Sequence, residues 1–141
     1  MFNRAMLKIG LAALLLINAL PTRAGSNQFT VTVQSFENWT IDGMLDPTLT
    51  LTRGQTYVFD LQSVSAVHPF FIKTVSSTGS GNQFSDGVTG NGATGDNDVS
   101  FQVPLTAPAQ LFYNCGSHGA MAGTLNIVDP DSVHADGFED P

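Results

Sequence analysis

The sequence predicts an all-β domain, built either as a sandwich or as a barrel. Short segments that alternate apolar and polar residues recur along the chain, as expected for half-buried strands. Turn-forming glycine, asparagine and aspartate residues separate these segments. Beyond residue 24, no long stretch repeats apolar residues with the 3.6-residue period of a helix. Many short strands with turns between them favour packed sheets or a closed barrel.

Seven segments have the pattern or the composition of a strand. The first two alternate apolar and polar residues, and a turn at 53–55 separates the second from a third that is rich in aromatic and β-branched residues. The fourth begins with Pro69, where the missing N–H of proline is tolerated. In chain order, the predicted strands are residues 29–34, 48–52, 56–61, 69–73, 99–103, 110–114 and 124–128.

Residues 76–98 differ in composition from the predicted strands. They are rich in glycine, serine, asparagine and aspartate, and only Phe84 and Val88 look like packing anchors. We expect a long excursion that these two side chains partly order. The acidic and amide side chains raise the alternative of a calcium site, but their spacing matches no EF-hand loop and ordinary turn chemistry is favoured. They are Asp86, Asn91, Asp96, Asn97 and Asp98.

Residues 1–24 have the features of a secretory signal peptide. Arg4 and Lys8 precede an apolar run at 9–20, and residues 22–24 (Thr-Arg-Ala) fit a small-residue cleavage site. The apolar run is shorter than the roughly 20 residues that span a membrane. We therefore expect a periplasmic or secreted protein without stable membrane insertion after cleavage. An uncleaved N-terminal anchor is the alternative.

Removal of the signal peptide would leave one strongly acidic domain at residues 25–128. Arg53 and Lys73 would be the only formal cations of the mature chain, residues 25–141, against all 12 acids, for a net charge of −10. Such a surface repels nucleic acid and anionic membranes, although it is compatible with a basic protein partner. Residues 129–141 carry five of the acids and are expected to form a flexible, solvated tail. His134 is assigned to that tail and not to a metal site.

A candidate metal site follows the strand predicted at 110–114. Cys115, His118 and Met121 bring a thiolate, an imidazole and a thioether into seven residues, and this soft ligand set suits copper. His68 supplies the second imidazole that a trigonal copper site with a weak axial methionine requires. Cys115 is the only cysteine, and an unpaired thiol in an oxidising compartment needs burial, a partner chain or a metal. The alternative is that Cys115 is a small buried hydrophobic residue.

With these residues, the chain from about residue 29 to 128 resembles the cupredoxins, the blue copper family. The C-x-x-H-x-x-M spacing from Cys115 to Met121 is similar to the short loop of amicyanin. The resemblance implies a Greek-key β-sandwich of seven or eight strands that holds one type 1 copper ion. It further implies that His68 and His118 bind through ring nitrogens, Cys115 through its thiolate and Met121 as the long axial ligand.

The chain departs from the family pattern beside two of these ligands. Many cupredoxins have asparagine after the first histidine, and its backbone N–H reaches the cysteine sulfur, whereas Pro69 has no N–H to donate. Family members often have proline before the second histidine, but Ser117 keeps its N–H. We therefore expect the donor to the sulfur to lie on the Ser117 side, which would alter the reduction potential.

The function that these features predict is a one-electron carrier that cycles copper between Cu(II) and Cu(I) with a redox protein partner. The protein is expected to be a monomer. It is not expected to be an enzyme, because two usable histidines cannot build the further copper sites of an oxidase. Two alternatives remain open, namely copper storage, delivery or tolerance without electron transfer, and an interaction module on the same fold. Storage proteins usually carry Met-rich or His-rich runs, whereas Met44 is the only other methionine after residue 24.

A docking patch for the partner is expected around His118. Its neighbours in the chain have little bulk to shield the ring edge, and Pro69 and Phe70 are expected to add apolar surface nearby. Trp39 and the phenylalanines are otherwise assigned to the core. The small neighbours are Gly116, Gly119, Ala120 and Ala122.

Overall fold

The computed structural model describes residues 27–131, so the predicted signal peptide and the tail beyond residue 131 lie outside the described range. This part of the chain contains ten strands and no helix, and therefore no helix able to cross a membrane. The strands are β1 (Gln28–Val33), β2 (Trp39–Ile41), β3 (Met44–Leu45), β4 (Leu49–Thr52), β5 (Thr56–Leu61), β6 (Phe70–Lys73), β7 (Val88–Thr89), β8 (Asp98–Gln102), β9 (Gln110–Cys115) and β10 (Ala122–Val128).

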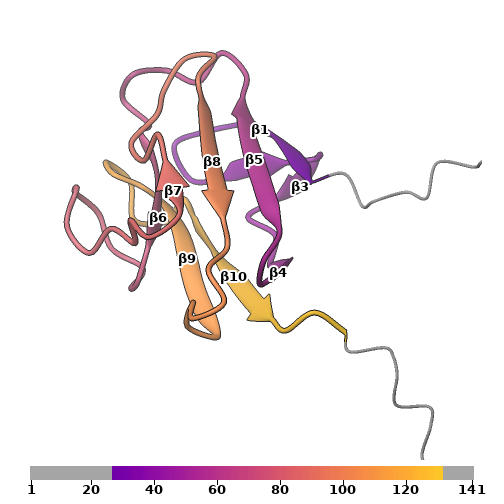
Figure 1. Cartoon of the computed structure of the whole chain (residues 1–141). Coiled ribbons are helices and arrows are strands. Elements are labelled where there is room, and N and C mark those ends of the chain that lie inside the picture. Colours follow the sequence, from indigo (N-terminus) through magenta and orange to yellow (C-terminus); the bar gives the residue numbers. More distant parts are fainter. Residues whose placement is uncertain (1–26, 132–141) are drawn as a thin grey trace, which may run out of the picture.

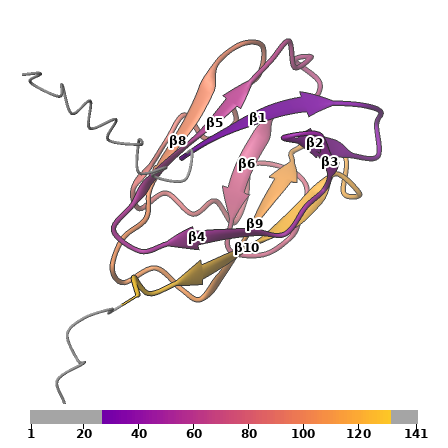
Figure 2. The same ribbon diagram turned by 90° about the vertical axis from the view of Figure 1, so that its right-hand side faces the viewer.

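The strands form two sheets that pack face to face. One has the order β3-β2-β1-β5-β8-β7 and the other the order β4-β10-β9-β6. Figure 2 shows β1, β5 and β8 in one layer and β4, β9 and β10 in the other. Two neighbouring pairs, β1 with β5 and β4 with β10, are parallel, and the other pairs are antiparallel. The predicted all-β sandwich is confirmed.

The structure has more strands than the seven or eight expected. All seven predicted segments are strands, and no end differs from the expected one by more than two residues. The additional strands β2, β3 and β7 contain only two or three residues each. An alternation of apolar and polar residues cannot be recognised over so short a length, so these three short strands were missed.

The core lies between the two sheets and follows from the period of two within each strand. In β5, Tyr57, Phe59 and Leu61 are buried, whereas the intervening Val58 and Asp60 are only partly buried. Trp39 in β2 is fully buried, as the sequence analysis expected. Complete burial of a large apolar side chain contributes about 1.5–3 kcal/mol, so this central cluster is the main source of stability.

Strand β6 is buried on both of its faces. Phe70 and Ile72 pack into the core between the sheets, whereas Phe71 and Lys73 alternate with them on the outer face. The excursion after β6 approaches that outer face, since a Cβ placed on Gly92 would lie 3.0 Å from the Phe71 ring. This loop runs beside β6 in Figure 1.

The excursion at residues 76–98 is ordered by the two expected anchors and by side-chain hydrogen bonds. Phe84 and Val88 pack against the core. The side chain of Asn91 accepts from the Ile72 N–H (2.7 Å) and donates to the Phe84 carbonyl (3.0 Å). The carboxylate of Asp96 accepts from the Ser63 N–H (2.7 Å). These contacts agree with the turn chemistry that the sequence favoured.

Tyr113 in β9 is a fully buried phenol. Its hydroxyl donates to the Pro47 carbonyl oxygen at 2.6 Å. Burial raises the pKa of Tyr113 well above its ordinary value of 10, and the nearby Asp46 carboxylate adds to the rise. The folded protein therefore keeps the phenolic proton to a higher pH than the unfolded chain does.

This difference predicts how stability changes in alkaline solution. The contribution of Tyr113 is complete below the unfolded pKa of about 10 and is lost as the pH rises above it. Tyr113→Phe should reduce the slope of the unfolding free energy above about pH 10 by up to 1.4 kcal/mol per pH unit. Urea unfolding between about pH 9 and pH 11.5 measures the slope. Equal slopes for parent and variant would contradict the prediction.

Candidate metal centre

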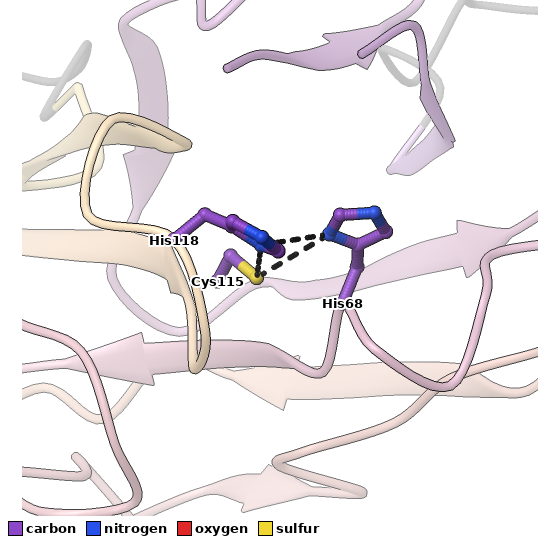
Figure 3. Close-up of side chains that lie close together, drawn as sticks. All are labelled: His68, Cys115 and His118. Carbon is purple, nitrogen blue, oxygen red and sulfur yellow. Dashed lines mark hydrogen bonds between the residues drawn. The ribbon is translucent and has the colours of Figure 1, made fainter. Parts of the chain in front are cut away.

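Three of the predicted ligands meet at one end of the sandwich. The Cys115 Sγ atom lies 3.7 Å from His68 Nδ1 and 3.6 Å from His118 Nδ1, and the two nitrogens are 3.1 Å apart. Figure 3 shows both rings turned toward the sulfur, with His118 and Cys115 on one loop and His68 on a separate segment. Among the described residues, these three form the one group of histidine, cysteine and acidic side chains close enough to share a metal ion.

Backbone pairing between β6 and β9 brings His68 close to Cys115. Phe70 lies opposite Cys115 in this antiparallel ladder. The Gly116 N–H donates to the Pro69 carbonyl oxygen at 2.9 Å and extends the pairing beyond the end of β9. The His68 N–H donates to the Ser65 carbonyl oxygen at 2.9 Å, in the tight turn that leads into β6.

The loop between β9 and β10 is closed by its own backbone. The Cys115 N–H donates to the Met121 carbonyl oxygen at 2.9 Å, and the Met121 N–H donates to the His118 carbonyl oxygen at 3.2 Å. These bonds fold residues 115–121 tightly enough for Cys115 and His118 to face the same point. The fourth predicted ligand, Met121, has a fully buried side chain at the base of this loop. Its role as the axial ligand remains a prediction.

The predicted ligands differ in their access to solvent. Cys115 is fully buried and His68 is 4% exposed, whereas His118 is only partly buried. Burial lowers the pKa of His68, and the neighbouring His118 lowers it further. Both effects favour the neutral imidazole, which is the form that binds metals. One histidine is thus held inside the protein, and the other reaches its surface.

The spacing of the three donor atoms fits a single metal ion. A triangle with sides of 3.1, 3.6 and 3.7 Å has a centre about 2.0 Å from each corner, close to ordinary metal–nitrogen and metal–sulfur bond lengths of about 2.0 and 2.3 Å. A hydrogen bond between the two Nδ1 atoms would account for their separation of 3.1 Å, but not for the approach of both nitrogens to the sulfur. Two imidazoles and one thiolate in a plane are the donors of a type 1 copper site, so these residues fit one type 1 copper ion.

The expected change of hydrogen-bond donor to the sulfur is confirmed. The Ser117 N–H donates to Cys115 Sγ at 3.3 Å, and Pro69 has no N–H to donate. The Cys115 thiol also lies 4.0 Å from the Val67 carbonyl oxygen, which is a weak contact. The sulfur therefore has one backbone donor, and that donor belongs to the ligand loop itself.

Two aromatic side chains belong to the site although the sequence analysis did not place them there. The Phe36 ring lies with its centroid 5.6 Å from both histidine rings. The Trp39 ring meets His68 edge-on at 6.4 Å, and its Nε1–H donates to the Met121 carbonyl oxygen at 3.0 Å. Phe36 lies in a polar stretch that reads as an ordinary loop, so no local pattern indicates its position.

The apolar surface beside the histidines differs from the expected one. Phe70 was expected to contribute to it, but its side chain is fully buried, because in β6 it points into the core. Phe36 is instead 67% exposed and Val67 is 51% exposed. Both line a surface groove that reaches His68. Pro69 is partly buried beside Gly116.

Comparison with known proteins shows the fold. No protein-family model matches the sequence, and no curated protein matches it. The NMR structure of reduced rusticyanin is similar, with 15% identity, 72% of this chain and 76% of that chain covered, and a TM-score of 0.51. Rusticyanin from Thiobacillus ferrooxidans has 19% identity, the same coverage and a TM-score of 0.47. The likeness to the NMR structure identifies the sandwich as cupredoxin-like, in agreement with the resemblance seen in the sequence.

Trp39→Phe tests how the core supports the ligand loop. Loss of the indole N–H and part of its volume should lower the free energy of unfolding of the metal-free protein by about 2–3 kcal/mol. The amide hydrogen of Cys115 should also exchange faster, because it shares the Met121 carbonyl oxygen with Trp39. Urea unfolding and amide hydrogen exchange measure the two effects.

Tyr57→Phe is the control for this variant. It removes a hydroxyl that accepts from the Thr52 N–H at 2.9 Å, far along the sequence from the ligand loop. This variant should lose stability without a specific change at Cys115. Equal exchange rates of the Cys115 amide in the two variants, after correction for stability, would contradict the prediction that Trp39 supports the ligand loop.

Proposed function

We propose that this protein is an exported type 1 copper protein that carries single electrons between redox partners. The observation that carries the proposal is the meeting of His68, Cys115 and His118, with their donor atoms 3.1–3.7 Å apart at one end of the sandwich. The cupredoxin-like fold supports it independently of the distances. Bound copper would supply one-electron chemistry between Cu(II) and Cu(I).

Each ligand residue has a distinct role in this proposal. His68 and His118 would hold the copper through Nδ1, Cys115 through its thiolate, and Met121 through its thioether as a weak fourth ligand. The strand pairing and the loop hydrogen bonds support a site that keeps its shape when the charge changes, because its donors are held before any metal binds. A site that needs little movement between two oxidation states favours rapid electron transfer.

Export and the absence of catalysis complete the proposal. Residues 1–24 support secretion to the periplasm or beyond, as a monomer without a membrane anchor after cleavage. A buried thiol that binds a metal resolves the problem of an unpaired cysteine in an oxidising compartment. The chain has three histidines, of which two serve this site, so a second copper centre for oxidase chemistry has too few ligands.

The redox partner would approach through His118. This residue is the histidine ligand that reaches the surface, and Phe36 and Val67 provide exposed apolar area beside the two rings. Glycine and alanine at positions 119 and 120 are exposed and add little bulk. An apolar patch of this kind suits a small transient interface, and the acidic charge of the domain would mainly affect the rate of encounter.

The absorption spectrum of the copper-loaded protein tests the copper assignment. An intense thiolate-to-copper band should appear toward the red end of the visible range and should bleach reversibly on reduction. Cys115→Ser should abolish the band and leave the fold intact, because sulfur and oxygen differ little in size. His134→Ala removes the histidine assigned to the tail and should keep the colour. A coloured Cys115→Ser protein would exclude Cys115 as the ligand that gives the band.

Electron-transfer kinetics with basic cytochromes test the docking patch. Ala120→Lys places a charge beside His118 and should slow the reaction about tenfold at low salt. Leu105→Lys is the matched control, because Leu105 is 75% exposed and packs near Gly54, at the opposite end of the sandwich. It should change the rate by about twofold or less. Equal rates in both variants, with copper intact, would favour storage or delivery over electron transfer.

A further inference from the structure

Lys73 is a buried cation that the proposed copper chemistry does not use. Its side chain is fully buried on the outer face of β6. The ammonium group donates to the carbonyl oxygens of Ser77 and Gly79, both at 2.6 Å, and lies 5.3 Å from the centre of the Phe71 ring. Such short bonds indicate a charged donor. Lysine is almost never fully buried without a partner, so its position requires an explanation.

No carboxylate neutralises this charge. Within residues 27–131, the one ion pair is that of Arg53 with Asp129. Burial lowers the pKa of Lys73, and the nearby Cys115 sulfur opposes that shift. The positive charge is therefore balanced by carbonyl dipoles and by the ring of Phe71.

The segment that Lys73 holds, residues 76–79, contacts the ligand loop. The Gly79 N–H donates to the Gly116 carbonyl oxygen at 2.7 Å, directly after Cys115. The Ser76 hydroxyl donates to the Asn114 side chain at 2.9 Å, directly before Cys115. The residues on both sides of the thiolate ligand are thus bonded to a segment that Lys73 anchors.

A third contact comes from Phe71, the neighbour of Lys73 on the same face. A Cβ added to Gly116 would lie 2.8 Å from the Phe71 ring, so the ring packs directly on the backbone after Cys115. The ammonium lies over this same ring. The outer face of β6 and the segment 76–79 therefore hold the ligand loop from the side opposite the core.

We propose that Lys73 is a positioning residue for the copper loop and that its unneutralised charge shifts the copper equilibrium toward Cu(I). The inference rests on the proposed function, because it concerns the reduction potential of that same site. Phe70 lies opposite Cys115 in the ladder, so the backbone of Lys73 is three residues, or about 10 Å, further along β6 than the position opposite Cys115. At an effective dielectric constant of about 20, a unit charge about 10 Å from the copper would shift a one-electron equilibrium about tenfold, or 59 mV.

The test compares Lys73→Met and Lys73→Gln with the parent and with Arg53→Met. Arg53 is the matched control, because it is the other cation after residue 24 and its guanidinium pairs with Asp129, beyond the end of β10 away from the ligand loop. Both Lys73 variants should favour Cu(II) about tenfold, a decrease of 59 mV in potential. Arg53→Met should leave the potential unchanged, and Lys73→Arg should restore most of the parent value.

Amide hydrogen exchange of the metal-free proteins provides a readout without copper. The amides of Gly79 and Gly116 should exchange about tenfold faster in Lys73→Met than in the parent, after correction for global stability. Arg53→Met should leave them unchanged. The exchange measurement tests the positioning role of Lys73 even if the parent fails to bind copper. Failure to bind copper would contradict the proposed function, but not the positioning role.

Three outcomes would overturn the inference. The first is that the parent binds copper and is blue, but the Cu(II)/Cu(I) equilibrium of both neutral variants stays within about twofold of the parent value. The second is an equal shift in Arg53→Met, which would assign the effect to net charge and not to position. The third is failure of both neutral variants to fold, which would make Lys73 a requirement of the whole sandwich and not of the ligand loop.

Discussion

The pairing of β6 with β9 is the constraint on which the candidate site depends. His68 and Cys115 are 47 residues apart in the chain, and the ladder that places Phe70 opposite Cys115 brings their side chains together. A slip of one residue in this ladder would turn the Cys115 side chain to the other face of the sheet. The buried, apolar inner positions of both strands oppose such a slip, so the packing of the core fixes the geometry of the donors.

The site is therefore supported from two sides. On the inner side, Trp39 bonds to the Met121 carbonyl oxygen and meets His68 edge-on. On the outer side, Phe71 packs on the backbone of Gly116, where the absence of a side chain permits the contact. A loop held between two packed layers has few alternative conformations, which explains how a short run of glycine, serine and alanine can present ligands in a defined arrangement.

The local patterns of the sequence were sufficient to predict an all-β domain and the soft ligand set at 115–121, whereas the sandwich and the place of His68 in the site came from the resemblance to the cupredoxins. Alternation identified the long strands, and the side-chain chemistry of that ligand set identified the site. Phe36 could not be predicted, because its place over the histidines depends on how the loop before β2 folds back. Phe70 was misassigned because β6 is buried on both faces, and a run of apolar residues does not reveal which side chain points outward.

The position of β10 determines when the sheet that carries the ligand loop can be completed. This last strand lies between β4 and β9, so the four-stranded sheet cannot close until residues up to Val128 have joined it. Its parallel partner β4 is more than 70 residues earlier in the chain, and pairing over such a separation is slow to form. The loop that carries His118 is closed locally by the pairing of β9 with β10, and it takes its place beside His68 as the sheet is completed. Metal capture by the full set of ligands is thus coupled to the end of folding, and a chain that has not finished folding presents its cysteine without the geometry that would hold a metal.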